Sequence, residues 1–302
     1  MVRLRSASPR APGWTATPCA ATTPSGRCST RPTGSSRRRS GSRDRTMLTL
    51  DDDLRCVAPG GLFDPATRTL VIADVHAGYV RSLQSRGYLL PGVDDRELFA
   101  RIARLRERLD PATVVIAGDV VHGPASMRAS PDGASALDGL LSALDGCAAV
   151  IVPGNHDRGL DAALHGRGVT VCERWAFGPH VALHGDDPEV LRAERASARR
   201  GGGRVVIGHH HPALVLRDAV GARTKVMAFA WAPGIVCLPA LTPFARGSDL
   251  VLDDEAAGLT AAVDASELET AVIVGERVLP TGRLDRVRAV QRRGPARRQR
   301  AG

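Results

Sequence analysis

Short apolar runs rich in Val, Ile and Ala recur along this chain, and each is followed by a polar residue, a glycine or a proline. The five clearest runs are Thr69–Ala73, Thr113–Ala117, Ala149–Val152, Val181–Leu183 and Arg204–Ile207. Continuous apolar runs of this length are typical of strands that are buried on both faces of a sheet. The pattern therefore predicts an α/β fold in which buried strands feed polar loops.

Segments between these runs carry the longer period of helices. The clearest is an apolar stripe with spacings near 3.6 residues, which leaves most of the neighbouring arginines outside it. Its members are Leu98, Phe99, Ile102, Leu105 and Leu109. Asp94, with Glu97 three residues later, can cap the start of this helix. Further helices are expected at about residues 133–144 and over residues 187–200.

Beyond His211 the apolar runs are broken by glycine and proline and show no strong helical stripe. They lie at residues 213–219, 226–231, 235–239 and 271–279. We expect strands here, some of them antiparallel, that complete a second sheet.

Charge separates the two ends of the chain from its body. Residues 1–46 carry ten arginines against one acidic residue, and residues 286–302 carry seven arginines and no acidic residue. Because the whole chain has a net charge of +9, residues 47–285 have a net charge of −7. Both ends hold too little apolar surface to offset the entropy of ordering, so we expect two disordered tails around one folded domain at 47–285. The abrupt change of composition at Met47 also allows translation to begin there.

The basic ends could touch nucleic acid without sequence preference, although solvated charge on a disordered tail is the plainer interpretation. The six cysteines show no CxxC spacing, which gives no support to a zinc knuckle or a redox pair. The sequence has no apolar segment long enough for a membrane helix and no secretory signal pattern. We therefore expect a cytoplasmic protein without a membrane partner.

Side chains that can bind metal ions follow five predicted strands in succession. They are Asp74 with His76, Asp119, Asn155 with His156 and Asp157, His184, and His209 with His211. In open α/β sheets the carboxyl ends of the strands are where ligands bind, so we expect these side chains to converge there. Carboxylate, amide and imidazole donors without a thiolate suit Mn²⁺, Fe, Zn²⁺ or Ni²⁺.

The spacing within two of these motifs predicts which side chains share an ion. Asp74 and His76 are two residues apart, so in an extended segment both side chains leave the same face. His209 and His211 have the same spacing, and a bend there could send the two imidazoles to different ions. Asp119 can bridge two cations with its two oxygens. The glycines beside the ligands are expected to allow close approach of the backbone: Gly118, Gly154 and Gly208.

Each motif taken alone has a simpler interpretation. Gly118-Asp119 after a strand is usually a turn, and the run His209–His211 could be a surface metal-binding stretch or a set of packed imidazoles. His184 alone would be an ordinary histidine at the end of a strand. All of them together, in this order and each after a strand, make chance a poor explanation. The combination predicts a metal centre.

The ordered set Asp-x-His, Gly-Asp, Gly-Asn-His-Asp, His and Gly-His-x-His resembles the calcineurin-like metallophosphoesterase superfamily from about Leu70 to His211. The resemblance implies a sandwich of two mixed β-sheets flanked by helices, with the active site at the carboxyl ends of the strands. It also implies that Asp74, His76 and His211 bind one divalent ion, that Asn155, His184 and His209 bind a second, and that Asp119 bridges both. His156 would be a catalytic histidine that binds no metal, and Asp157 would orient it.

The second motif departs from the Gly-Asp-x-x-Asp-Arg-Gly pattern that is common in the superfamily, because it ends in Val121-His122-Gly123. The missing Asp-Arg pair argues against the branch of protein Ser/Thr phosphatases. The stretches Ala73–Tyr79 and Leu238–Pro243 instead resemble a branch of prokaryotic phosphoesterases. That branch is related to ligase-associated DNA-damage-response endonucleases and to archaeal proteins similar to double-strand-break-repair nucleases.

The resemblance implies a phosphodiesterase or nuclease that acts on DNA or RNA. Two cations about 3.5–4 Å apart would activate a bridging hydroxide for attack on phosphorus. Manganese is the expected ion, with iron, zinc and nickel as alternatives. Four further side chains are candidates for contact with the substrate: His122, Arg158, Arg81 and Arg86.

Two other functions are open to a chain of this sequence. The acidic body weakens the case for a nuclease and favours a phosphodiesterase or phosphomonoesterase of small molecules, such as cyclic nucleotides or nucleotides. A scaffold without catalysis is the third possibility, but it should have lost metal ligands, and every ligand motif is present here.

Overall fold

The structure of the protein is a computed structural model. It describes residues 19–20, 46–89, 95–128, 135–218, 220–245, 247–252, 259 and 263–293. Apart from residues 19–20 and 46, the predicted N-terminal tail lies outside these ranges, as do Asp94 and the segment 294–302.

The first sheet contains seven strands in the order β2-β3-β4-β5-β6-β7-β8. Their bounds are β2 Met47–Thr49, β3 Arg55–Val57, β4 Gly61–Asp64, β5 Thr69–Ala73, β6 Thr113–Ala117, β7 Ala148–Val152 and β8 Thr170–Val171. Strands β2 to β5 pair antiparallel, whereas β5 to β8 pair parallel. The first three runs predicted from the sequence are thus the neighbouring parallel strands β5, β6 and β7.

The second sheet contains ten strands and is also mixed. Their bounds are β1 Cys19–Ala20, β9 Trp175–Phe177, β10 His180–Leu183, β11 Val205–Ile207, β12 Pro212–Arg217, β13 Arg223–Ala232, β14 Ile235–Cys237, β15 Ser248–Asp249, β16 Glu269–Val274 and β17 Arg277–Arg283. Strands β10, β11 and β14 pair parallel, and β12, β13, β16 and β17 form antiparallel pairs. The expected antiparallel strands after His211 are confirmed.

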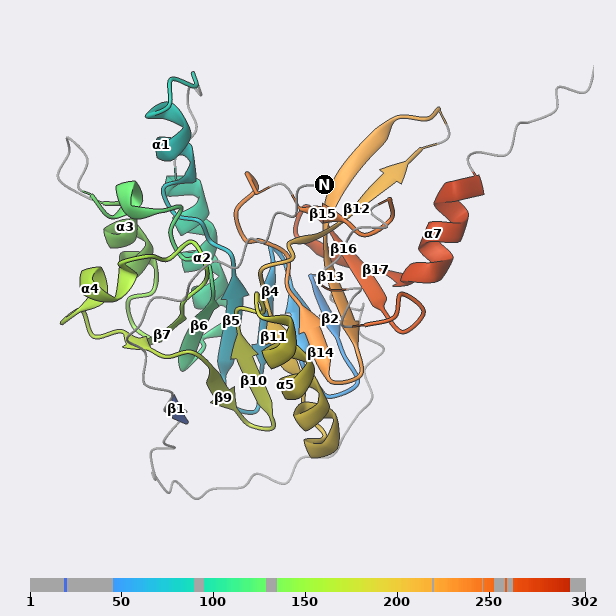
Figure 1. Cartoon of the computed structure of the whole chain (residues 1–302), viewed down its shortest axis with the longest axis horizontal. Coiled ribbons are helices and arrows are strands. Elements are labelled where there is room, and N and C mark those ends of the chain that lie inside the picture. The colour runs from blue at the N-terminus through green and yellow to red at the C-terminus, as the bar shows by residue number, and fades with distance from the viewer. Residues whose placement is uncertain are drawn as a thin grey trace, which may run out of the picture.

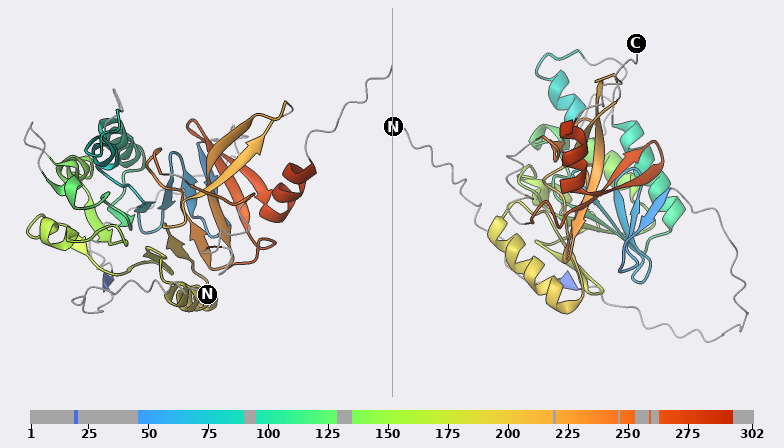
Figure 2. Two further views of the ribbon diagram at one scale, coloured as in Figure 1. Left: turned by 45° about the horizontal axis from the view of Figure 1, so that its top comes forward. Right: turned by 90° about the vertical axis from the view of Figure 1, so that its right-hand side faces the viewer.

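Helices cover the outer faces of both sheets. They are α1 Tyr79–Gln84, α2 Arg96–Leu109, the 3-10 turn η1 Pro124–Met127, α3 Ala136–Ala143, α4 Leu160–Leu164, α5 Pro188–Gly201 and α7 Leu284–Arg293. Helices α1 to α4 gather beside the first sheet, and α5 and α7 lie beside the second (Figure 1 and Figure 2). The predicted sandwich of two mixed sheets flanked by helices is confirmed. Within the described ranges, none of the helices has the length and apolar character to cross a membrane.

The alternation of side chains along β5 shows how one strand serves two apolar layers. Leu70 and Ile72 join the cluster beneath the helices of the first sheet, whereas Val71 and Ala73 join the cluster between the sheets. All five residues of β5 are buried, which explains why its sequence is continuously apolar. The carboxyl ends of these strands are therefore held by packing on both faces.

Three boundaries differ from the sequence predictions. Helix α3 begins at Ala136, because Ser135 and Asp138 form a capping box there. The run 271–279 is a hairpin of β16 and β17, which turns at Gly275. Helix α7 passes through the predicted start of the C-terminal tail, so residues 286–293 are helical. The reason is the buried Leu284 at its start, which packs with Val287 into the cluster on the outer face of the second sheet.

Candidate metal centre

The predicted metal-binding side chains lie at the carboxyl ends of the parallel strands in both sheets. In the first sheet, Ala73 pairs with Ala117 and Ala117 with Val152, so β5, β6 and β7 end in register. In the second sheet, Leu183 pairs with Ile207, so β10 and β11 also end in register. Each candidate ligand follows one of these ends within four residues. Parallel pairing therefore brings three of the five loops together in the first sheet and two in the second, and the apolar cluster between the sheets holds the two sets side by side.

A first group of side chains surrounds one position between β5, β6 and β11. One ligand atom from each of Asp74, His76, Asp119 and His211 lies within 4.8 Å of all the others. The Nε2 atom of His211 is 3.3 Å from Oδ2 of Asp74, and Nε2 of His76 is 3.7 Å from Oδ2 of Asp119.

A second group surrounds Nε2 of His184. This atom lies 3.0 Å from Oδ1 of Asn155, 3.1 Å from Nδ1 of His209 and 3.7 Å from Oδ1 of Asp119. Donor atoms that bind one ion at about 2.1 Å, at right or tetrahedral angles, lie about 3.0–3.5 Å from each other. Two of the three distances lie in this range and the distance to Asp119 is slightly longer, which fits side chains gathered around one ion position.

Asp119 belongs to both groups, with one oxygen on each side. Its Oδ2 faces His76, and its Oδ1 faces His184 and accepts a hydrogen bond from the backbone N–H of His156 at 3.0 Å. The carboxylate thus lies between the two positions.

The buried polar atoms of the centre fit divalent cations. The side chains of Asp74 and Asp119 are almost inaccessible, with residue exposures of 0% and 2%. Among the described residues, Oδ1 of Asp74 and Nε2 of His211 are buried without a hydrogen-bond partner. A buried polar atom without a hydrogen-bond partner is costly, and a cation bound among these side chains would satisfy it. The donor set of carboxylate, imidazole and amide is one that first-row divalent ions accept.

The pKa shifts of Asp119, His76 and His184 are also compatible with a bound cation, whereas the carboxylate of Asp74 raises the pKa of His211. Burial, together with the charge of Asp74, raises the pKa of the Asp119 carboxyl to about 7. Burial and neighbouring imidazoles lower the pKa of both His76 and His184 to about 3. Neutral imidazole is the form that binds a metal ion, and a bound cation would restore the charge of Asp119.

The backbone at the ligands is not extended, and this corrects the reason given for the Asp-x-His spacing. Asp74, His76, Asp119, His209 and His211 all have positive φ, between 43° and 63°. Alternation along a strand therefore does not explain how Asp74 and His76 approach the same position. Each chain segment instead turns sharply at its ligand. Hydrogen bonds fix these turns, including His209 N–H to Oδ2 of Asp74 at 2.9 Å.

Three glycines leave room for the ligands, as the sequence predicted, and at Gly154 an added Cβ would overlap Oδ1 of Asp119. At Gly208 an added Cβ would lie 2.6 Å from Oδ2 of Asp74 and 2.8 Å from the carbonyl oxygen of Ala117. At Gly118, which has a φ of 83°, an added Cβ would overlap the imidazole of His184. The backbone approaches the ligands too closely for any other residue type.

His156 and Asp157 lie beside the two groups but differ in surroundings. His156 is exposed, and its ring centre lies 5.3 Å from that of His76. Asp157 is buried and accepts three backbone hydrogen bonds, from Val120, Val121 and Gly154 at 3.2, 3.0 and 2.8 Å. Its carboxylate thus ties the loop after β7, which carries His156, to the loop after β6.

Of the four candidate substrate contacts, His122 and Arg86 have a demonstrable relation to the centre. The ring of His122 stacks on that of His156 with 5.7 Å between centres. Arg86 is exposed and near enough for its charge to help lower the pKa of His122, after burial and His156. Arg81 donates a hydrogen bond to the carbonyl of Arg128 at 3.3 Å. Arg158 is exposed in the loop after β7.

Two aromatic side chains to which the sequence analysis assigned no role also lie here. The ring centre of Tyr79 is 4.3 Å from that of His122, and Phe244 lies parallel to Tyr79 at 6.3 Å. Tyr79 follows the Asp-x-His motif by three residues, which was the available signal. Phe244 is far away in sequence, and only the folded chain brings it close.

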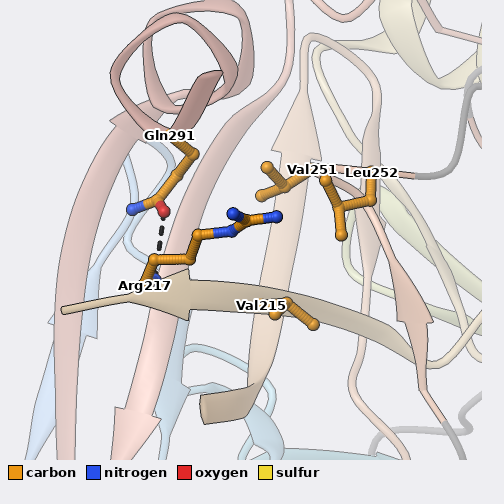
Figure 3. Close-up of a pocket in the computed structure, with 5 residues that line it drawn as sticks. All are labelled: Val215, Arg217, Val251, Leu252 and Gln291. Carbon is orange, nitrogen blue, oxygen red and sulfur yellow. Dashed lines mark hydrogen bonds between the residues drawn. The ribbon is translucent and has the colours of Figure 1, made fainter. Parts of the chain in front are cut away.

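A separate hollow lies at the far end of β12 from His211. Its lining combines Val215, Arg217, Val251, Leu252 and Gln291, and the guanidinium of Arg217 points into it (Figure 3). The backbone N–H of Arg217 donates a hydrogen bond to the side chain of Gln291 in α7 at 3.0 Å. None of the candidate metal ligands lines this hollow.

Comparisons with known proteins agree with this geometry. The family model of the calcineurin-like phosphoesterases matches residues 67–258. No curated protein matches the chain. A solved structure, the nuclease MPE from Pseudomonas putida, is 24% identical in sequence and aligns with a TM-score of 0.55. The alignment covers 78% of this chain and 98% of that one, and at this identity it shows a shared fold.

Proposed function

The chain belongs to the calcineurin-like phosphoesterase family and is a hydrolase that acts on phosphoesters, and we propose that its substrates are phosphodiesters of DNA or RNA. The observation that carries the proposal is the pair of ligand groups that share Asp119. Bound at these two groups, divalent ions, with manganese as the first candidate, would polarise the phosphoryl group and lower the pKa of a water molecule.

We assign the ligands as two sets with one common member. Asp74, His76 and His211 would hold one ion, and Asn155, His184 and His209 the other. Asp119 would contribute one oxygen to each. The short distances around His184, and the 3.3 Å between Nε2 of His211 and the buried carboxylate of Asp74, support this division.

His156 is the candidate acid of the reaction. Its exposed imidazole can reach a phosphoryl oxygen or the leaving alkoxide, and a proton given to that alkoxide completes cleavage of the P–O bond. Asp157 would act through the backbone, by holding the loop that carries His156. We assign to Arg86 and Arg158, both exposed, the neutralisation of phosphate charge.

We favour a polymer as the substrate because Asn155 and His156 are both exposed, so that the centre is open on that side. The structural likeness to a protein named as a nuclease supports the same choice. The net charge of −7 for residues 47–285 favours the second candidate, a small phosphate ester, since nucleic acid prefers a basic surface.

Hydrolysis of bis-p-nitrophenyl phosphate and of p-nitrophenyl phosphate, each with Mn²⁺, tests the proposal. We expect faster cleavage of the diester, and we expect Mn²⁺-dependent cuts in labelled DNA, assayed as a single strand and as a duplex. Faster cleavage of the monoester, without cuts in DNA, would overturn the diesterase assignment.

Replacement of His156 tests its role. His156→Ala should keep metal binding and lower kcat on the diester by about 100-fold or more, since general acid catalysis contributes at least that much. His165→Ala is the matched control, because His165 is also exposed but lies in none of the groups around the centre. Full activity of His156→Ala would remove this residue from catalysis.

A further inference from the structure

Tyr79 and Phe244 extend the imidazoles of the metal centre into a continuous row of rings. From the centre outward, the ring of His122 lies 5.5 Å from that of His76, and Tyr79 lies 4.3 Å from His122. Phe244 follows with its plane within 6° of that of Tyr79. We call Tyr79 and Phe244 the aromatic shelf. The ring centre of Tyr79 lies 6.5 Å from that of His76, which is about the rise of two stacked bases in a nucleic acid strand.

Backbone contacts hold the chain segments that carry Tyr79 and Phe244 close to the metal centre. A backbone bridge between Ala77 and Val121 holds the start of α1, where Tyr79 lies, next to the segment of His122. Between them Gly78 packs so closely on Ser126 that an added Cβ would overlap it. On the other side, Leu241 donates a backbone hydrogen bond to Ala73 at 3.0 Å, directly before Asp74. The loop of Phe244 is thus anchored at the end of β5.

The two rings of the aromatic shelf are not part of the hydrophobic core. Neither Tyr79 nor Phe244 belongs to any of the three apolar clusters within the described residues, and both are partly exposed. Aromatic residues make up only 3% of this chain, and Phe63, Phe177 and Phe229 are used as buried core. Two partly exposed rings beside the metal centre therefore call for another explanation.

We propose that the aromatic shelf binds a nucleobase next to the scissile phosphate. A flat base can stack on an exposed aromatic ring, and such stacking tolerates any sequence because every base has a π-face. We call residues 79–89 the arm. The arm favours binding of a nucleic acid strand at this place, because it contains Arg81 and Arg86 and no acidic residue. The proposal rests on the phosphodiesterase function and specifies the part of the substrate that is recognised beyond the phosphate.

A double-mutant cycle tests this contact by removing a nucleobase from the substrate, the aromatic ring from the protein, or both. The substrates are an octathymidylate and the same strand with one base replaced by hydrogen, at each position in turn. With the wild-type protein and Mn²⁺, loss of one base should lower kcat/KM at the neighbouring phosphate by about five- to hundredfold. In Tyr79→Leu, the complete strand should already be cleaved this slowly, and loss of that base should cost little more.

Three variants keep the test decisive. Phe244→Leu should weaken the same dependence on one base, and Tyr79→Phe should retain it, because stacking requires the ring and not the hydroxyl. Tyr88→Leu is the matched control, since Tyr88 lies on the same arm, is 60% exposed and is not part of the row of rings. Independent, additive effects of base and ring would overturn the proposal, even with full Mn²⁺-dependent activity.

Binding separates this proposal from the proposed function. Fluorescence anisotropy of the same labelled strands in EDTA and low salt measures the cycle without turnover. If the wild-type protein does not cleave the strands, but base and ring still depend on each other in binding, the phosphodiesterase function is contradicted and the shelf remains a base-binding site. Cleavage with no effect of Tyr79→Leu or Phe244→Leu on either measurement would contradict the shelf alone.

Discussion

Five of the candidate metal ligands occupy a backbone conformation that L-amino acids usually avoid. Their positive φ angles cost about 1–3 kcal/mol each, which a fold tolerates only where surrounding contacts hold the conformation. Here those contacts include the hydrogen bond from His209 N–H to Asp74 and the close packing of Gly208 on the same carboxylate. The shape of the centre is therefore built by turns, and glycine is required beside them.

Gly208→Ala tests this requirement. The added methyl group would meet Oδ2 of Asp74, so we expect a loss of about 1–3 kcal/mol of unfolding free energy and a loss of the rise in Tm that Mn²⁺ produces. Gly201→Ala is the matched control, because its Cβ would meet nothing within 4 Å and both glycines lack a positive φ. Differential scanning calorimetry with and without Mn²⁺ measures both. Equal behaviour of the two variants would contradict the argument.

The sequence predicted the chemistry of the ligands better than their geometry. Donor types and their positions after strands could be identified from the printed residues alone. The left-handed turns could not, because φ at Asp74 or His211 depends on hydrogen bonds to other loops. The same limit hid Phe244, whose place beside Tyr79 is set by contacts between distant segments.

At the scale of elements, the loops after β6 and β7 behave as one unit. Asp157 joins them by accepting backbone hydrogen bonds from Val120, Val121 and Gly154. Asp119 joins them again through the backbone N–H of His156. Displacement of either loop would therefore move the catalytic candidate His156 relative to the ligands.

Asp157→Ala should break this connection. Up to three buried N–H groups would lose their acceptor, and we expect a loss of about 3–5 kcal/mol of unfolding free energy. At a temperature where the variant stays folded, we expect kcat on bis-p-nitrophenyl phosphate to fall by about 100-fold, because small displacements of a catalytic group are costly. Urea unfolding and steady-state kinetics give the two numbers.

Asp249→Ala provides the comparison for that variant. Asp249 is also buried and accepts backbone hydrogen bonds, from Val215 and Val251 at 3.1 and 3.0 Å, but it lies outside the metal centre. The Asp249→Ala variant should lose stability and keep the kcat of the wild-type protein. If the two variants lose kcat equally, the activity loss reflects stability and Asp157 has no positioning role.

Strands with a continuous run of apolar, mostly β-branched residues were predictable, whereas strands without such a run were not. The runs at β5, β6, β7 and β11 are buried on both faces and so carry a continuous apolar signal. Strands β2, β3 and β4 are only three or four residues long, and polar or turn-forming residues separate them. Their pairing arises from the antiparallel meander, which no single segment reveals.

At the scale of the whole molecule, the centre forms where two sheets meet. Asp74, Asp119 and Asn155 come from the first sheet, and His184, His209 and His211 come from the second. The apolar cluster between the sheets, with Val71, Val115 and Val206 among its members, holds these two halves together. Periodicity predicts each sheet, but the packing of one sheet on the other followed only from the family resemblance.

Anomalous X-ray diffraction from crystals grown with Mn²⁺ tests the central claim most directly. The account predicts two manganese peaks about 3.5–4 Å apart on either side of the Asp119 carboxylate. One peak should contact Asp74, His76 and His211, and the other Asn155, His184 and His209. A single peak at this edge of the sheets, or manganese bound only elsewhere on the molecule, would contradict it.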